Sequence, residues 1–388
     1  MKQEKLWTPE FLSMGGSNFL LFMSQYILIA ALPIFIMEKL GGGEMEAGLA
    51  MTFFQIGTVV CRPLAGRVID SVNKQHLLLA ATLVFFLIMI GFNLFQSLTS
   101  IYTLRLMHGV IFALTTTAAA AMAAMVLPAA RKGEGIGYFA LSTNLAMVVG
   151  PLIGLLLIGN LGADTMFQFM AVLALVTIWT ANHRHLPAEI IQPAPKTKSG
   201  WQITDFVEPG ALAMAGLGGL VFFAYGGILT FIPLYARSLG LQSETSLFFV
   251  VFAAVIILSR PLVGRLFDTK GPDYTIYPGF LLFGLGLILF SQIASLTGLL
   301  LSAAVLGIGF GALSPAFQTL AIQSAPPARA GVATATYFWS LDISVGLAAV
   351  LLSLAAAHWG YAVMYGMIST GIIILAACCY FCWRHHRS

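Results

Sequence analysis

The chain has 388 residues, of which 59% are hydrophobic and 9% are charged, and its mean hydropathy is +0.91. Such a composition excludes a soluble globular protein, in which about a quarter of the residues are charged. The net charge of +4 is small, and most basic residues lie in connecting segments. They suit orientation in a lipid bilayer, and no nucleic-acid partner is expected.

Apolar runs recur from end to end, and each provides the roughly 20 residues that a helix needs to cross a bilayer. The predicted fold class is all-α integral membrane, with twelve transmembrane helices in two pseudo-symmetric six-helix bundles. The first bundle, residues 1–182, has predicted helices at 10–39, 44–69, 75–96, 99–127, 133–159 and 164–182. The second, residues 207–388, has them at 207–236, 243–267, 274–295, 297–324, 329–357 and 360–383. A polar, proline-containing linker, 183–206, separates the bundles.

The distribution of basic residues predicts the orientation. All 19 Lys and Arg residues except Lys39, Arg105 and Arg237 fall in segments that lie on one side of the membrane in this layout. The positive-inside rule makes that side the cytoplasm, so we expect a multi-pass protein of the cell (plasma or inner) membrane with both termini cytoplasmic. The first segment is too long for a signal peptide, which predicts that this helix is retained.

The first predicted helix is unusually polar, with Asn18, Gln25 and Tyr26 among several serines. Uncharged polar groups in hydrocarbon need partners or a water-filled cavity. Two interpretations are open: the helix faces a transport cavity, or it forms hydrogen bonds with neighbouring helices.

A nine-residue stretch occurs twice. Residues 62–70 return as residues 260–268, with six of nine positions identical at an offset of 198. One polar connection per half indicates a duplicated transporter. The repeated arginines and glycines are Arg62, Gly66, Arg67, Arg260, Gly264 and Arg265.

Each copy ends in an aspartate, Asp70 or Asp268, at the C-terminal end of a predicted helix. The helix dipole disfavours a negative charge there, so we expect compensating partners. Nearby Lys and Arg residues or the N-terminus of a neighbouring helix would serve. The functional interpretation is a cytoplasmic gate that holds the halves together in one state; the alternative is a solvated cluster obeying the positive-inside rule.

Arg105 and His108 lie three residues apart and therefore on one face of the predicted helix 99–127. A guanidinium inside a membrane helix is costly unless it faces protein or water, so Arg105 is a candidate functional residue. His108 is either a group that exchanges protons near neutral pH or a structural histidine.

Two further patterns lie in equivalent helices of the halves. The helix 133–159 carries the small or kinking residues Gly137, Gly150, Pro151 and Gly154, which predict close packing and a bend. In the helix 329–357, Asp342 is the only acid that falls well within a predicted span, and the offset of 198 relates it to Asn144. Asp342 is either a transport residue or a structural acid.

The four cysteines indicate neither a disulfide framework nor a zinc motif, and we expect no cofactor and no metal. No nucleophile and base stand at a credible catalytic spacing, so an enzyme is not expected.

Taken together, these features resemble the major facilitator superfamily over the whole chain. Gly66, Asp70 and Lys74 match the family's loop motif between the second and third helices, and Gly264 and Asp268 match its second copy. Ser71, Asn73 and Gln75 depart from that motif. Arg105 and Gly109 look like the fourth-helix motif, and residues 137–154 are similar to the fifth-helix motif associated with exporters.

The resemblance implies the twelve-helix drug or metabolite exporter branch. We therefore expect a secondary active transporter, a proton-coupled exporter (antiporter) of small amphiphilic organic molecules, that works by alternating access as a monomer. Its partners would be the small-molecule substrate, protons and the bilayer. An importer or facilitator of a small metabolite, an exporter of one specific metabolite, and a sensor built on the transporter fold are the alternatives.

Overall fold

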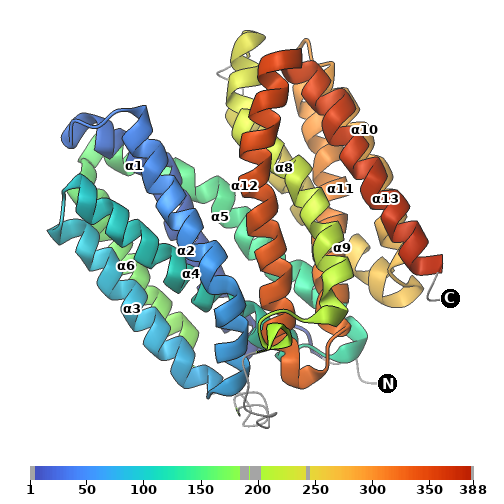
Figure 1. Ribbon diagram of the computed structural model, residues 1–388, viewed down its shortest axis with the longest axis horizontal. Helices are drawn as coiled ribbons and strands as arrows, with labels where there is room; N and C mark the ends of the chain where they lie inside the picture. Colours follow the sequence, from blue (N-terminus) through green and yellow to red (C-terminus); the bar gives the residue numbers. More distant parts are fainter. Residues whose placement is uncertain (1–4, 184–191, 193–201, 242–244, 386–388) are drawn as a thin grey trace. The chain divides into compact units, whose positions relative to one another are not determined.

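The computed structural model describes residues 5–183, 192, 202–241 and 245–385 (Figure 1). Every regular element within these residues is a helix, and eleven continuous helical segments are long and apolar enough to cross a membrane. The last such segment, Pro327–His385, is interrupted at Gly360, where φ is 78° and ψ is 165°. It therefore holds two spans, and the predicted twelve-helix membrane fold is confirmed.

The helices of the first half are α1 (Pro9–Lys39), α2 (Glu44–Ser71), α3 (Lys74–Leu94), α4 (Leu98–Val126), α5 (Lys132–Leu161) and α6 (Ala163–Asn182). Those of the second half are α8 (Leu212–Ser238), α9 (Thr245–Lys270), α10 (Asp273–Ser291), α11 (Leu296–Gln323), α12 (Ala330–Val363) and α13 (Thr370–His385). A π-helix, Met364–Ser369, joins the last two. Most bounds lie within three residues of the predicted ones.

The duplication extends to the helix ends. Ser97 and Ser295, which are 198 residues apart, cap α4 and α11 by accepting hydrogen bonds from backbone N–H groups at 3.3 and 3.2 Å. Gly162 and Gly360, at the same offset, have φ of 84° and 78° in the turns that precede the last helix of each half. A side chain is strained at such φ values, so both turns require glycine.

Four predicted boundaries lie more than three residues from the observed ones. Two of them belong to the last pair of helices: the predicted break at 357–360 coincides with the kink at Gly360, but helical backbone continues through Val363 and the π-helix to Thr370.

The helix predicted at 274–295 ends at Ser291, because Ser295 must be extended (φ −153°, ψ 161°) to cap α11. The helix predicted at 207–236 begins only at Leu212, after the short 3-10 helices Ile203–Asp205 and Pro209–Ala211. A proline at 209 disfavours helical backbone at the residue before it, which delays the start. Most of the predicted linker lies outside the described residues.

The chain forms two compact units. The first comprises 1–128, 142–209 and 325–339, and the second comprises 129–141, 210–324 and 340–388. The units follow the predicted halves except that the start of α5 groups with the second half and the start of α12 groups with the first. Each exchanged segment is the beginning of the fifth span of its own half.

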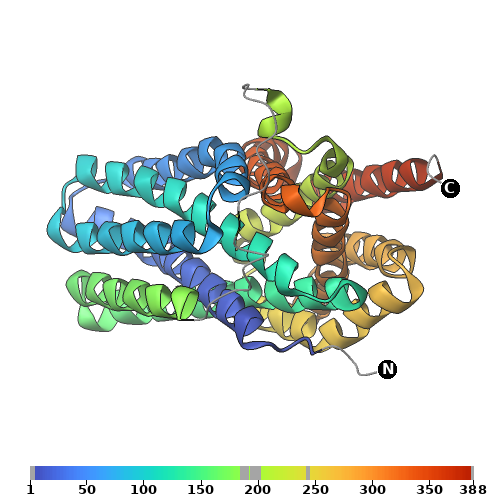
Figure 2. The ribbon, with the colours of Figure 1, turned by 90° about the horizontal axis from the view of Figure 1, so that it is seen from below.

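The first unit is a bundle in which α2 packs on α4, α3 on α6, and α1 on both α4 and α6. Figures 1 and 2 show these helices running side by side. Its core contains Phe35, Phe92 and Phe167, whose rings contact one another at centroid distances of 5.0 and 5.8 Å. Burial of such rings supplies much of the packing within the unit.

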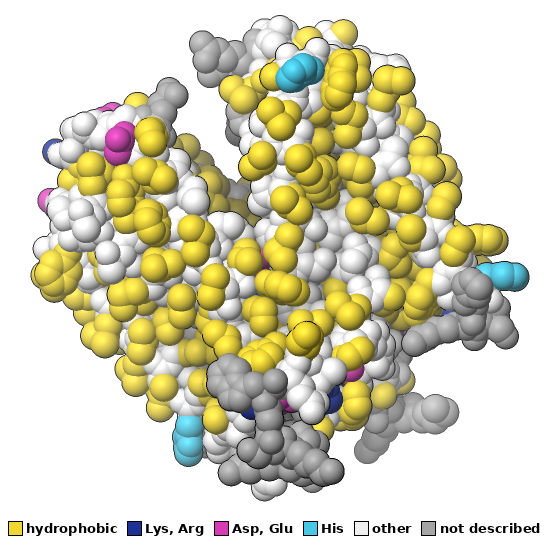
Figure 3. Space-filling view, viewed as in Figure 1, with side chains coloured by type: hydrophobic (Ala, Val, Ile, Leu, Met, Phe, Trp, Pro, Cys, Tyr) yellow, Lys and Arg dark blue, Asp and Glu magenta, His cyan; other side chains and the backbone are white. Residues whose placement is uncertain are grey.

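In the second unit α10 packs on α11, and α11 packs on α8 and α9. Tyr225 of α8 stacks on Phe310 of α11 at 4.0 Å and on Phe252 of α9 at 5.8 Å. On the face seen in Figure 3, hydrophobic side chains are spread along the helices of both units. Leu87 and Leu258 expose 63% and 78% of their surface, as expected for side chains that face lipid.

Candidate functional site

Each repeated aspartate caps the N-terminus of a helix from the opposite half of the sequence. Asp70, at the end of α2, accepts hydrogen bonds from the N–H groups of Gly331 and Val332 at 3.0 and 2.9 Å. Both N–H groups belong to the first turn of α12, which has no intrahelical acceptor for them. A carboxylate also interacts favourably with the positive end of the helix dipole. All of these residues lie in the first unit.

The second unit repeats this contact at the same offset. Asp268, at the end of α9, accepts hydrogen bonds from the N–H groups of Gly133 and Glu134 at 2.9 and 2.8 Å, in the first turn of α5. Of the two kinds of partner that the sequence left open, the neighbouring helix N-terminus makes the direct hydrogen bonds in both copies. Arg265 is exposed.

The repeated glycines let the helices approach closely enough for these bonds. A Cβ at Gly66 would lie 2.7 Å from the Cβ of Ala335 and 2.8 Å from the Cα of Val332. A Cβ at Gly264 would lie 2.7 Å from the Cα of Glu134. These distances are shorter than any van der Waals contact, so any larger residue would separate the helices.

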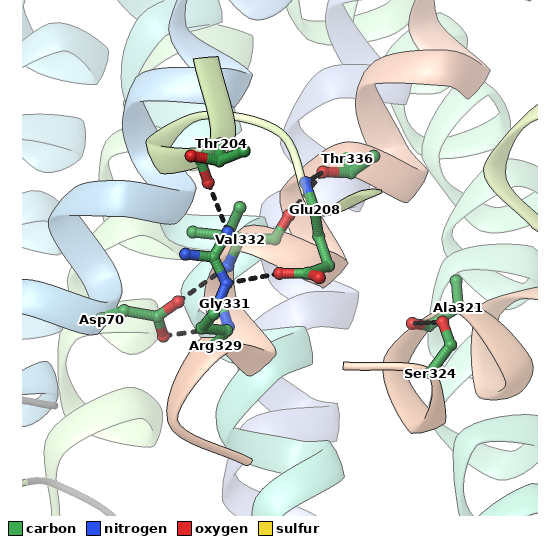
Figure 4. Close-up of polar contacts among 9 residues, drawn as sticks. All are labelled: Asp70, Thr204, Glu208, Ala321, Ser324, Arg329, Gly331, Val332 and Thr336. Atoms are coloured by element: carbon green, nitrogen blue, oxygen red, sulfur yellow. Dashed lines mark hydrogen bonds and ion pairs between the residues drawn. The ribbon is translucent and has the colours of Figure 1, made fainter. Parts of the chain in front are cut away.

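Additional polar contacts surround Asp70 (Figure 4). Arg329, just before α12, forms an ion pair with Glu208 and donates a hydrogen bond to the carbonyl oxygen of Thr204. The backbone N–H of Glu208 donates to the hydroxyl of Thr336 on α12 at 2.9 Å. The chain that follows the linker is thus attached to the start of α12.

Arg67 of α2 contacts the same segment of chain. Its guanidinium lies 3.7 Å from the carboxylate of Asp205 and 5.2 Å from the ring centroid of Phe206. In the second unit, the counterpart of Arg329 is Arg131, which lies just before α5 and pairs at 2.8 Å with Glu134 in the first turn of that helix. The two aspartate contacts are therefore alike, but their surroundings differ.

The arginines that begin the two repeats are both buried, with 3% of their surface exposed. Arg62 donates hydrogen bonds to the hydroxyls of Thr116 and Thr117 at 3.0 and 3.1 Å and lies 4.9 Å from the ring centroid of Phe338. Hydroxyl oxygens and an aromatic face together replace the water that this guanidinium loses.

Arg260 reaches the equivalent place on α11 but finds a different acceptor. It donates to the carbonyl oxygen of Gly311 at 2.7 Å. Pro315, four residues later, has no N–H, so this carbonyl has no partner in its own helix. Arg260 therefore compensates for the proline in α11.

Arg105 is fully buried among neutral groups of the first unit. It donates to the carbonyl oxygen of Ala50 at 3.2 Å and to the side-chain oxygen of Gln25 at 3.1 Å, and it lies 3.3 Å from Nδ1 of His108. Its guanidinium stands 4.5 Å from the ring centroid of Phe54. None of the ion pairs among the described residues includes Arg105.

The structure thus brings together Arg105, His108 and Gln25 of the predicted site. His108 is fully buried, and its Nε2 has no hydrogen-bond partner among the described residues. Asn18 serves a helix contact instead, donating to the hydroxyls of Ser142 and Thr143 on α5 at 2.8 and 2.9 Å. The contacts of Asn18 and Gln25 with neighbouring helices confirm the second interpretation for these two residues, and the transport cavity stays a prediction.

The small residues of α5 pack on α1 within the first unit. A Cβ at Gly150 would lie 2.6 Å from the Cβ of Tyr26, and one at Gly154 would lie 3.0 Å from a backbone oxygen of Ile27. Pro151 stands between them inside the helix. Asn144, on the same helix, is 8% exposed, and Gly137 belongs to the other unit, beside Arg260.

Asp342 lies on α12 in the second unit and is half-buried. The face of α12 that packs on α8 carries Ser340 and Ser344, which lie next to Gly219. Asp342, two residues from each serine, projects from a different side of the helix. The Arg105 cluster belongs to the first unit.

Residues 14–349 match the sequence pattern of the Major Facilitator Superfamily, which is most of the chain. The chain belongs to this family. Secondary transport across a membrane is thus its general function, and the fold described above is the scaffold for it. Among the described residues, no group of three or more His, Cys, Asp or Glu side chains is arranged to hold a metal ion.

Similar MFS-type transporters occur in Burkholderia pseudomallei and Methanocaldococcus jannaschii. An MFS-type transporter of Burkholderia pseudomallei (strain 1106a) is 26% identical over 366 residues, which cover 91% of this chain and 87% of the relative. An MFS-type transporter of Methanocaldococcus jannaschii is 22% identical over 372 residues, covering 93% and 92%. The crystal structure of the human organic anion transporter MFSD10 (TETRAN) has the same fold, with a TM-score of 0.80, 15% identity and coverage of 96% and 98%.

Several contacts in the structure could not be predicted from the sequence. The repeat of Arg131 as Arg329 was visible, but nothing in the sequence indicated that Glu208 would be the partner of Arg329. The π-helix at Met364–Ser369 was also missed; within it Tyr365 donates to the carbonyl oxygen of Gly227 at 2.9 Å. An i to i+5 register has no marker in composition.

Proposed function

We propose that this protein is a proton-coupled exporter of small amphiphilic organic molecules, an antiporter that works by alternating access. The observation that carries the proposal is Asp342, a half-buried acid in the interior of a membrane-spanning segment. The other described acids near membrane spans lie at helix ends or in connections. An ionisable group at membrane depth marks a pathway for protons or ions by default.

In this mechanism Asp342 takes up a proton from outside and releases it to the cytoplasm, while substrate moves the opposite way. Arg105, His108 and Gln25 form the second polar site, in the other unit. Arg105 and His108 either complete the proton route or orient the substrate. The two aspartate contacts would form the cytoplasmic gate, because each joins segments from opposite halves of the chain. Opening toward the cytoplasm requires both to break.

Export, rather than import, is proposed from the packing of α5 on α1. Gly150, Pro151 and Gly154 resemble the fifth-helix motif of exporters, and their close contact with α1 fits a role in setting the conformations of the cavity. Both termini and the linker are placed in the cytoplasm, on the basis of the Lys and Arg distribution.

A second candidate is transport of an organic anion, as named for MFSD10. The observation that favours it is the fully buried Arg105, whose acceptors are all neutral. A substrate carboxylate would supply the missing negative charge. Amphiphilic anions would satisfy both candidates, so the substrate screen should contain amphiphilic cations, anions and neutral compounds.

The test is flux in proteoliposomes with and without an imposed pH gradient. We expect gradient-driven transport by the parent, and a fall of about 100-fold in Asp342→Asn, with exchange of substrate across the membrane in the absence of a gradient retained. Asp164→Asn is the matched control, because Asp164 is the acid in the first turn of α6. Undiminished gradient-driven transport by Asp342→Asn would disprove its coupling role, and substrate movement with the proton gradient would indicate an importer.

A further inference from the structure

The second unit contains a cavity beside Arg260. It measures about 10 Å³, and its walls include Gly133 and Gly137 of α5, Gly264 of α9 and Thr319 of α11. Arg260 exposes 3% of its surface, and its Nε has no hydrogen-bond partner among the described residues. A buried donor without an acceptor is destabilising, and a charged donor is more so.

The charge of Arg260 is also uncompensated. None of the ion pairs among the described residues includes it. The carboxylates packed nearest to this region are engaged elsewhere: Asp268 with the start of α5, and Glu134 with Arg131. A buried cation without a counter-ion is unfavourable. An anion in the cavity would accept a hydrogen bond from the Nε–H of Arg260 and would also neutralise its charge.

In the first unit, the side chains at the equivalent positions are larger. At the offset of 198, Gly137 corresponds to Ala335, whose Cβ packs on Gly66. Ala140 corresponds to Phe338, whose ring covers the guanidinium of Arg62. An aromatic ring thus covers the first arginine at a position where the second unit has alanine.

We propose that the cavity beside Arg260 binds a monatomic anion, chloride under physiological conditions, held by the Nε–H of Arg260. A volume of about 10 Å³ is space for one small occupant, comparable to a single water molecule, which favours a monatomic ion. A water molecule fits but leaves the charge uncompensated. The anion would contact α5, α9 and α11 together and would stabilise the packing that supports the Asp268 contact.

The test is thermal unfolding of the purified protein in detergent, with chloride replaced by gluconate at constant ionic strength. In the parent we expect a saturable rise in Tm of about 2 °C at chloride concentrations about ten times Kd, and the same rise with bromide. Gly137→Ala should remove most of this rise. Its Cβ would lie 3.5 Å from Nη1 and 3.6 Å from Cδ of Arg260, an ordinary contact that occupies cavity space.

The matched control is Ala335→Gly, the reverse change in the first unit, which should keep the full response to chloride. A parent Tm that does not depend on chloride, or an undiminished response in Gly137→Ala, overturns the proposal and leaves water as the occupant. Should Gly137→Ala not fold, anomalous scattering from bromide-soaked crystals of the parent decides: a peak beside Arg260 supports the site, and its absence overturns it. Neither measurement depends on transport.

Discussion

The two copies of the repeat make the same contact through their aspartates and different contacts through their arginines. Asp70 and Asp268 each accept two backbone N–H groups, at distances between 2.8 and 3.0 Å. Arg62 binds two threonine hydroxyls under an aromatic ring, whereas Arg260 binds one carbonyl beside a cavity. The aspartate contacts use backbone N–H groups, which are present whatever the side chain, so both copies keep them. The contacts of Arg62 use the side chains of Thr116, Thr117 and Phe338, and they are lost where the second unit has other residues.

The glycine contacts give the largest expected effect. Gly66→Val and Gly264→Val each place side-chain atoms against the backbone of the facing helix, so the closed contact cannot form. We expect labelling of an introduced Ala333→Cys, in a background without the four native cysteines, to accelerate about 100-fold in purified protein. Ala333 is fully buried at the start of α12.

Gly346→Val is the control, because no atom lies within 4 Å of the position that its Cβ would occupy. Its labelling should equal that of the parent. If only one of the two repeat variants accelerates labelling, the two copies are not equivalent parts of one gate.

Substitution of the repeated aspartates should have an intermediate effect on the labelling rate, and the effect should differ between the two copies of the repeat. Asn has a single acceptor oxygen, so in Asp70→Asn one of the N–H groups of Gly331 and Val332 faces the amide NH₂ group. Loss of a charged hydrogen bond costs about 1.5–3 kcal/mol, which predicts roughly 10-fold faster labelling of Ala333→Cys. Asp268 is more exposed than Asp70, so Asp268→Asn should have the smaller effect.

Asp164→Asn, at the first turn of α6, is the control for loss of an acid at a helix end. We expect the labelling rate of Ala333→Cys to be unchanged in this variant. Equal acceleration by Asp70→Asn and Asp268→Asn would mean that burial does not distinguish the two contacts.

The arginine contacts give the smallest effect. Phe338→Ala removes the ring over Arg62 and makes the first copy resemble the second. A cation–π contact contributes about 1 kcal/mol, so Tm should fall by about 2–4 °C. Loss of the ring should also open space beside Arg62, so we expect the rise in Tm with chloride to be larger in this variant than in the parent. An unchanged Tm would mean that the ring does not stabilise Arg62.

Much of the fold could be predicted because its signals are local. Apolar runs gave the spans, the offset of 198 gave the duplication, and serine and glycine at 97, 162, 295 and 360 mark helix ends. The candidate site was predicted less completely. Arg105 and His108 could be paired by their spacing, but their contact with Gln25 depends on how α1 packs on α4.

The twelve spans, the repeat and the acid that ends each copy of it could all be read from the amino-acid sequence. That these acids bind the first turns of α12 and α5 emerged from the packing of the helices. Every residue except proline carries a backbone N–H, so the partner has no signature in the sequence. Packing also decided that an aromatic ring covers Arg62 whereas a cavity lies beside Arg260, because Phe338 and Gly137 are each more than a hundred positions from the arginine that they approach.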